Sequence, residues 1–95
     1  MAEKDESSIE FPVDGTLDLH TFRPDEIKRL IPDYIDECLA RGILKIRIIH
    51  GKGKGVLRRI VHSALDKHPA VAAYRHESGS GGSWGATVVD LKKPT

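Results

Sequence analysis

Two histidines in this sequence combine a side chain suited to proton transfer with a position at the end of a strand-like run. His20 ends the run LDLH, and His50 ends a run rich in isoleucine. Histidine exchanges protons more readily near neutral pH than any other side chain. Asp18 precedes His20 by two residues, so on a strand both side chains share a face and the carboxylate can orient the imidazole. Two histidines at one phosphate would serve as base and acid in phosphodiester cleavage.

A loop in which glycines alternate with lysines follows His50. It reads GKGKG and leads into an amphipathic helix. Backbone amides of such a loop and of the helix start can hold a phosphate, because glycine lets the backbone approach an anion closely. The spacing is not that of a Walker loop, so we expect no use of ATP. The expected nucleic-acid-binding residues here are Gly51, Lys52, Gly53, Lys54, Arg58 and Arg59.

Several of these residues also allow other interpretations. A divalent ion such as Mg²⁺ or Mn²⁺ binds imidazole and carboxylate groups, so Asp18, His20 and His50 are candidate metal ligands as well. Trp84 lies in the glycine- and serine-rich segment 77–85. It either binds nucleic acid by stacking on a base or fills the small core. The other histidines are interpreted as structural or solvated: His62, His68 and His76.

The hydrophobic pattern predicts the elements that must position these residues. Alternating or continuous apolar runs predict strands over 16–20, 43–50, 70–76 and 86–91, with a further edge strand over 9–13. Three/four spacing predicts one helix from Pro24 to Gly42, kinked at Pro32, and a second from 56 to Pro69. The order β-α-β-α-β-β indicates the α/β class, as a two-layer sandwich with a four-stranded mixed sheet.

This order of elements has a consequence for the candidate site. Strand–helix–strand connections are nearly always right-handed crossovers between parallel strands, so the first three strands run parallel and the fourth returns as a hairpin. His20, the loop 51–55 and the loop 77–85 then follow the carboxyl ends of parallel strands. We expect all three at one edge of the sheet, where open α/β sheets bind their ligands.

Composition restricts the class of protein. Ninety-five residues, 39% hydrophobic and 31% charged, fit one globular domain with no membrane span. Cys38 is the only cysteine, so no internal disulfide forms, and we expect it in the core. The acidic N-terminus lacks a signal-type apolar region, which together with the single cysteine favours the cytoplasm.

The two halves of the chain carry opposite charge. Residues 1–40 contain eleven acids and four bases, and residues 41–95 contain eleven bases and three acids. The bases concentrate around the glycine loop, where they would attract a polyanion such as nucleic acid. The alternative is an ordinary solvated helix face beside an acidic tail.

Three motifs in this order resemble the Smr (small MutS-related) domain. They are LDLH at 17–20, HGKGKGVLR at 50–58 and GGSWGATVVDL at 81–91. The resemblance implies the fold of the C-terminal domain of bacterial translation initiation factor three. It places an Smr domain at 15–91, between a flexible acidic arm at 1–14 and a tail at 92–95. The chain contains no MutS clamp or ATPase region, so we expect a stand-alone Smr protein.

The resemblance also implies an activity, because members of this family are nucleases that nick DNA or cleave RNA. The family's Asp-x-His motif falls on Asp18 and His20, and its His-Gly-x-Gly motif falls on His50, Gly51 and Gly53. One departure is Thr21, which follows the first histidine where the family often has glycine. This difference reshapes or tightens the expected pocket.

Two functions of different classes follow. The first is an endonuclease that nicks DNA or cleaves RNA, with or without a metal, in which Asp18, His20 and His50 are catalytic. The alternative is a non-catalytic nucleic-acid or ribosome-binding module that uses the same basic edge. A small phosphorylated metabolite is a third candidate ligand. We expect a monomer that is not bound to membrane.

Overall fold

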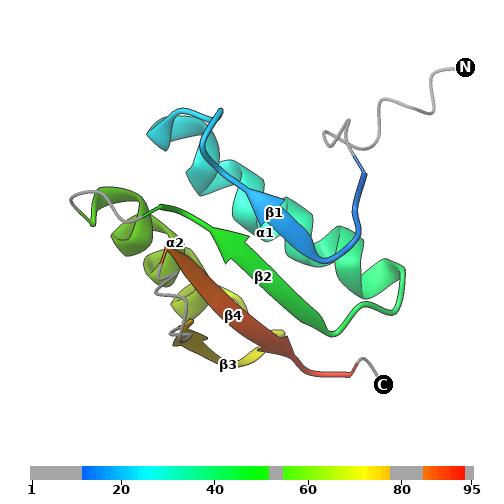
Figure 1. Ribbon diagram of the computed structural model, residues 1–95. Coiled ribbons are helices and arrows are strands. Elements are labelled where there is room, and N and C mark those ends of the chain that lie inside the picture. Colours follow the sequence, from blue (N-terminus) through cyan, green and yellow to red (C-terminus); the bar gives the residue numbers. More distant parts are fainter. Residues whose placement is uncertain (1–11, 52–54, 78–84, 94–95) are drawn as a thin grey trace, which may run out of the picture.

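The computed structural model describes residues 12–51, 55–77 and 85–93. Its element order matches the order predicted from the sequence (Figure 1). The elements are β1 Thr16–Asp18, α1 Pro24–Ala40, β2 Lys45–Ile49, α2 Val56–Lys67, β3 Val71–His76 and β4 Ala86–Leu91.

The four strands form one mixed sheet in the order β1-β2-β4-β3. β1 pairs with β2 in parallel, and β4 pairs antiparallel with both β2 and β3. β1, β2 and β3 therefore point the same way, as the crossover argument predicts. The hairpin does not simply extend the sheet, because β4 lies between β2 and β3.

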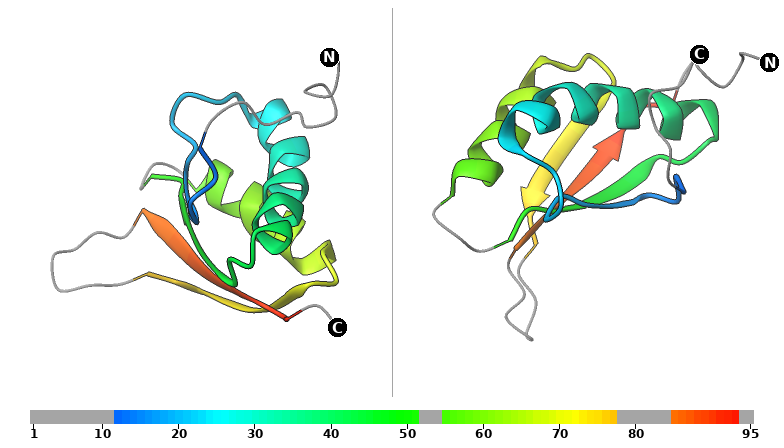
Figure 2. Two further views of the ribbon diagram at one scale, coloured as in Figure 1. Left: turned by 90° about the vertical axis from the view of Figure 1, so that its right-hand side faces the viewer. Right: turned by 90° about the horizontal axis from the view of Figure 1, so that it is seen from above.

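Both helices lie on one face of the sheet, so the domain has two layers (Figure 2). The hydrophobic pattern explains this arrangement, because each helix has one apolar stripe and each strand alternates. The larger side chains of the core come from both layers: Leu17, Leu19, Ile27, Ile31, Tyr34, Ile35, Ile46, Ile48, Val61, Leu65 and Val89. Cys38 is buried among them, which confirms its expected place in the core.

α1 begins at Pro24, as predicted, and the Glu26 side chain in its first turn bonds back to the residue before the helix. The backbone N–H of Arg23 donates to Oε1 of Glu26 at 2.8 Å. α1 continues through Pro32 without interruption. Gly42, with φ of 77°, follows the helix end at the predicted position.

Several predicted strand boundaries differ from the structure. β2 is Lys45–Ile49 rather than 43–50, and β3 begins at Val71 rather than at residue 70. β1 ends at Asp18 rather than at His20, because the chain turns there and the N–H of Phe22 bonds the carbonyl of Leu19 at 3.0 Å. Of the predicted edge strand 9–13, residues 9–11 lie outside the described residues. Pro12 and Val13 are not in a strand, although Val13 packs into the core.

No helix in the described part of the chain is long and apolar enough to cross a membrane.

Candidate active site

The carboxyl ends of the parallel strands meet at one edge of the sheet, together with the start of β4. The N–H of Leu19 donates to the carbonyl of Ile49 at 2.9 Å. The N–H groups of His50 and Gly51 both donate to the carbonyl of Gly85, at 2.7 and 2.8 Å. The segments after β1 and β2 thus lie together with the entry to β4, at the edge predicted from topology.

Asp18 and His20 form a hydrogen-bonded pair at this edge. Oδ1 of Asp18 lies 2.8 Å from Nδ1 of His20 and 3.0 Å from the backbone nitrogen of the same residue. These hydrogen bonds, from the His20 side chain first and its backbone second, lower the pKa of Asp18 below 3.8. Asp18 is therefore ionised at neutral pH, and the turn after β1 brings the imidazole onto its carboxylate.

The pair fixes which ring nitrogen of His20 is free. A carboxylate only accepts hydrogen bonds, so Nδ1 carries the proton and Nε2 of the neutral ring holds a lone pair. The His20 side chain is 75% exposed. Nε2 has no hydrogen-bond partner among the described residues. The ring can therefore accept a proton from a group brought to it by a ligand.

His50 has a different environment. It is only 6% exposed, and both ring nitrogens have partners within the protein. Nδ1 lies 3.1 Å from the carbonyl oxygen of Gly51, and Nε2 lies 2.8 Å from Oγ1 of Thr87. Burial lowers the pKa of His50 below 6.5, and the neighbouring charges of His76 and Arg58 lower it further. His50 is therefore neutral at pH 7.

The two histidine sites lie on different faces of the sheet. Leu17 of β1 is in register with Ile48 of β2, and both side chains are buried under the helices. Alternation from Ile48 places His50 on this covered face. Asp18 is in register with Ile49, on the opposite face. The structure thus places both sites at one edge without joining them in a hydrogen-bonded network.

The candidate metal ligands do not form a metal site. The described residues include Asp18, His20 and His50, and they contain no group of three or more His, Cys, Asp or Glu side chains able to hold a metal ion. The residues present therefore do not fit a divalent ion held by these three side chains.

Glycines bring the start of the expected phosphate loop, residues 51–55, against β4. Gly51 has φ of 85°, a conformation that favours glycine. A Cβ on Gly85 would lie 2.8 Å from Cα of Gly51, so a side chain there would displace the loop. Gly55, with φ of 87°, is the N-cap of α2 and leaves that helix end without a side-chain cap. Lys52, Gly53, Lys54 and Trp84 lie outside the described residues.

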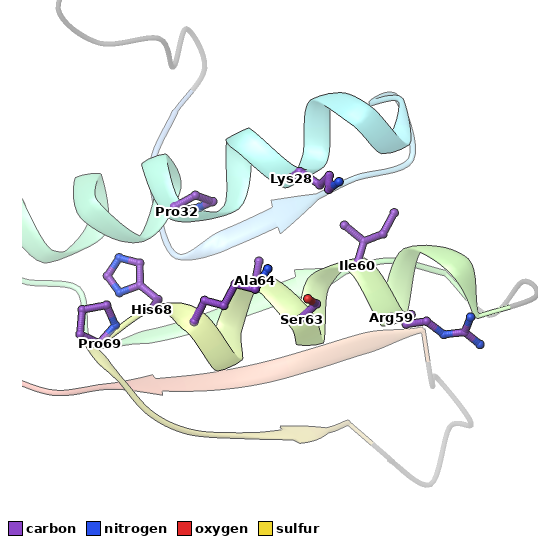
Figure 3. A pocket seen from close by; sticks show the side chains of 9 residues that line it. Lys28, Pro32, Arg59, Ile60, Ser63, Ala64, His68 and Pro69 are labelled. Carbon is purple, nitrogen blue, oxygen red and sulfur yellow. The ribbon is translucent and has the colours of Figure 1, made fainter.

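The two arginines at the start of α2 lie in different surroundings. Arg58 is close enough to His50 and His62 for its charge to lower the pKa of both. Arg59 instead lines a groove of about 510 Å³ between α1 and α2, together with Lys28 and Lys67 (Figure 3). Only Arg58 therefore belongs to the histidine edge.

The structure adds three residues that the sequence interpretation left out of the site. His62 of α2 places Nε2 3.0 Å from Oγ1 of Thr87, which is fully buried. The His76 ring stacks on that of His50 with centroids 6.0 Å apart. Alternation along β4 was an available signal, because it places Thr87 on the same face as Val89 and a threonine there needs polar partners.

Known proteins resemble this chain in sequence and in fold. The Smr domain family model matches residues 17–92. Endonuclease MutS2 of Halothermothrix orenii is 39% identical over 80 residues, which cover 84% of this chain and 10% of that protein. Endonuclease MutS2 of Staphylococcus saprophyticus is 40% identical over 76 residues, covering 80% of this chain and 10% of its own length. The chain thus spans about a tenth of the curated relatives it matches.

Two crystal structures share the fold. The Smr domain of Thermus thermophilus MutS2 superposes with a TM-score of 0.75 at 29% identity, covering 83% of this chain and 99% of that one. YdaL, a stand-alone small MutS-related protein from Escherichia coli, gives a TM-score of 0.73 at 30% identity, covering 97% of this chain and 76% of that one. With the three motifs and the sheet topology already described, these matches show that the chain belongs to the Smr domain family.

Proposed function

We propose that this protein is an endonuclease that hydrolyses or transesterifies phosphodiester bonds in nucleic acid. The observation that carries the proposal is the Asp18–His20 pair, in which an ionised carboxylate holds an exposed imidazole with Nε2 free. The relatives named Endonuclease MutS2 support it, although this chain matches only a tenth of their length.

In the proposed mechanism, His20 is the general base. Nε2 takes a proton from the attacking oxygen, which is a water or, on RNA, the 2′-hydroxyl, as that oxygen bonds to phosphorus. The bond from phosphorus to the leaving oxygen breaks, and that oxygen takes up a proton from solvent. Asp18 stabilises the imidazolium that forms and holds the ring in its reactive tautomer.

Phosphate binding is assigned to the neighbouring backbone and to arginine. The uncapped N-terminus of α2 carries partial positive charge, and Gly51 precedes it in the chain. Arg58 is exposed at this end of α2 and adds a full charge. Lys52 and Lys54, which follow Gly51 in the sequence, complete the proposed set. His50 remains a proposed site residue, and the proposal routes no proton through it.

One observation favours a second candidate, a module that binds nucleic acid without cleaving it. The groove between α1 and α2 is lined by Lys28, Arg59 and Lys67. These bases can contact a phosphate backbone without any catalytic group. Such a module in the cytoplasm, on messenger RNA or the ribosome, would use this groove and the loop edge together.

Replacing Asp18 by asparagine tests the endonuclease proposal. Asp18→Asn keeps the size of the side chain but removes the charge and permits the wrong His20 tautomer. We expect cleavage of plasmid DNA or structured RNA to slow by about 10²–10⁴-fold, the usual contribution of general acid–base catalysis. Oligonucleotide affinity should remain unchanged.

The matched control is Asp25→Asn, which makes the same chemical change at an exposed carboxylate paired with Arg23 in the first turn of α1. This variant should cleave at the wild-type rate. Equal cleavage by the Asp18→Asn and Asp25→Asn proteins would reject the site. Salt-dependent binding without cleavage by the wild type would favour the second candidate.

A further inference from the structure

The hydroxyl of Thr87 lies between two imidazoles that come from different elements. Nε2 of His50 is 2.8 Å from Oγ1, and Nε2 of His62 is 3.0 Å from the same atom. His50 follows β2, His62 lies on α2 and Thr87 lies on β4. Thr87 is fully buried, so water does not reach its hydroxyl. The two imidazole rings are the hydrogen-bond partners of that hydroxyl.

The protons in this cluster can be assigned by counting donors and acceptors. The carbonyl oxygen of Gly51 can only accept, so Nδ1 of His50 carries a proton. The buried ring is neutral, which leaves Nε2 of His50 as an acceptor. The single hydroxyl proton of Thr87 must then point to His50, and Oγ1 must accept from Nε2–H of His62.

This chain of hydrogen bonds ends on the peptide that begins the phosphate loop. His62 donates a hydrogen bond to Thr87, Thr87 donates to His50, and His50 donates to the carbonyl oxygen of Gly51. The N–H of Gly51 is held separately by the carbonyl of Gly85. The backbone N–H and C=O of Gly51, which belong to the peptide units before and after this residue, are therefore both held, and so is the direction in which the chain leaves β2.

We propose that Thr87 and His62 are positioning residues of the phosphate loop, which lock His50 in its Nδ1–H tautomer so that it holds the Gly51 carbonyl. His50 is then a clamp rather than an acid or base. This inference rests on the proposed function for its purpose, which is phosphate binding. Its geometry, however, can be tested without any cleavage.

Imidazole ¹⁵N–¹H NMR of the purified wild-type protein at neutral pH tests the tautomers directly. We expect opposite tautomers for the two rings: a protonated Nδ1 with a bare Nε2 for His50, and a protonated Nε2 with a bare Nδ1 for His62. A protonated Nε2 on His50, or the same tautomer on both rings, would overturn the inference.

Two substitutions at Thr87 separate positioning from simple packing. Thr87→Val keeps the shape and removes the hydroxyl, whereas Thr87→Ser keeps the hydroxyl and removes a methyl group. We expect Thr87→Val to mix the His50 tautomers and to weaken binding of a single-stranded oligonucleotide about fivefold, the order expected for one hydrogen bond.

Thr87→Ser should restore both the tautomer and the affinity, which a role in packing alone would not predict. Weaker binding by both variants, with wild-type tautomers in each, would overturn the inference. If the wild type binds the oligonucleotide but cuts neither RNA nor DNA, the endonuclease proposal fails. The tautomer and affinity results would still decide the role of Thr87 and His62.

Discussion

The two motif histidines differ in what their ring nitrogens contact. His20 keeps Nε2 exposed and uses Nδ1 to bond a carboxylate, the arrangement of a base. His50 uses both nitrogens inside the protein. The sequence predicted the Asp18–His20 contact from the shared face of a strand. The contact is present, but the turn that follows Asp18 makes it, since β1 ends at that residue. The sequence did not predict separate roles, because the face that each histidine occupies depends on strand register.

Burial of His50 predicts how stability varies with pH. Its pKa is lowered in the folded protein, so the unfolded chain binds a proton at a higher pH than the folded one does. The contribution of His50 to stability is therefore complete above pH 6.5 and is lost as pH falls below that value towards the folded pKa. The pKa of His62 is lowered in the same direction, chiefly by burial.

We therefore expect the free energy of unfolding to fall between pH 7.5 and pH 5, and to fall less steeply in His50→Gln. Urea unfolding at several pH values measures both slopes. The expected sign follows from proton uptake by the unfolded state. Parallel pH profiles for the two proteins would show that His50 is not held neutral.

At the scale of the elements, the junction between β2, β4 and α2 depends on close approach of two glycines. Sequence patterns indicated a glycine loop but not which glycine is required for space. A Cβ added to Gly85 would collide with the backbone of Gly51. A Cβ added to Gly42 would meet no atom within 4 Å, but the backbone there has a positive φ. The comparison of these two positions separates crowding from backbone strain.

Gly85→Ala should lower the free energy of unfolding by about 1–3 kcal/mol, the usual range for an overpacked site, and should weaken nucleic-acid binding. Gly42→Ala should cost about 1–2 kcal/mol through its left-handed conformation and leave binding unchanged. Chemical denaturation and oligonucleotide titration measure the two effects. Wild-type binding by Gly85→Ala would show that the Gly51–Gly85 contact does not shape the loop.

At the scale of the whole molecule, the sequence predicted the class, the element order and the direction of each strand. Apolar periodicity and right-handed crossovers were enough for this. They did not give the position of β4 between β2 and β3, because a hairpin can fold to either side of β3. That position matters for function, since it brings Gly85 and Thr87 beside His50.

The basic half of the chain is less exposed to a polyanion than its composition suggests. Lys45 pairs with Asp90 at 3.3 Å, and Arg47 pairs with Glu77 at 2.8 Å. Arg41 pairs with Glu37 at 3.5 Å. Arg58 and Arg59 have no ion-pair partner among residues 12–51, 55–77 and 85–93. These two arginines lie in the first turn of α2, so both are near a phosphate held at that helix end.

This distribution predicts the salt dependence of binding. The slope of log affinity against log salt should shrink by about one in Arg58→Ala, because each lost phosphate contact removes nearly one released counterion. Lys45→Ala removes the same charge from a paired lysine and should leave the slope unchanged. Oligonucleotide titrations across salt concentrations measure both, and equal slopes for the two variants would argue that binding follows net charge rather than this surface.

The most direct measurement of the central claim compares cleavage of matched RNA and DNA by wild type, His20→Ala and His68→Ala, purified identically. His68 bonds Asp36 at the far end of α2, so it controls for loss of a histidine elsewhere. We expect cleavage by the wild type and by His68→Ala, and its loss in His20→Ala, with oligonucleotide binding retained in all three. Cleavage at equal rates by all three proteins would contradict the assignment of His20 as the base.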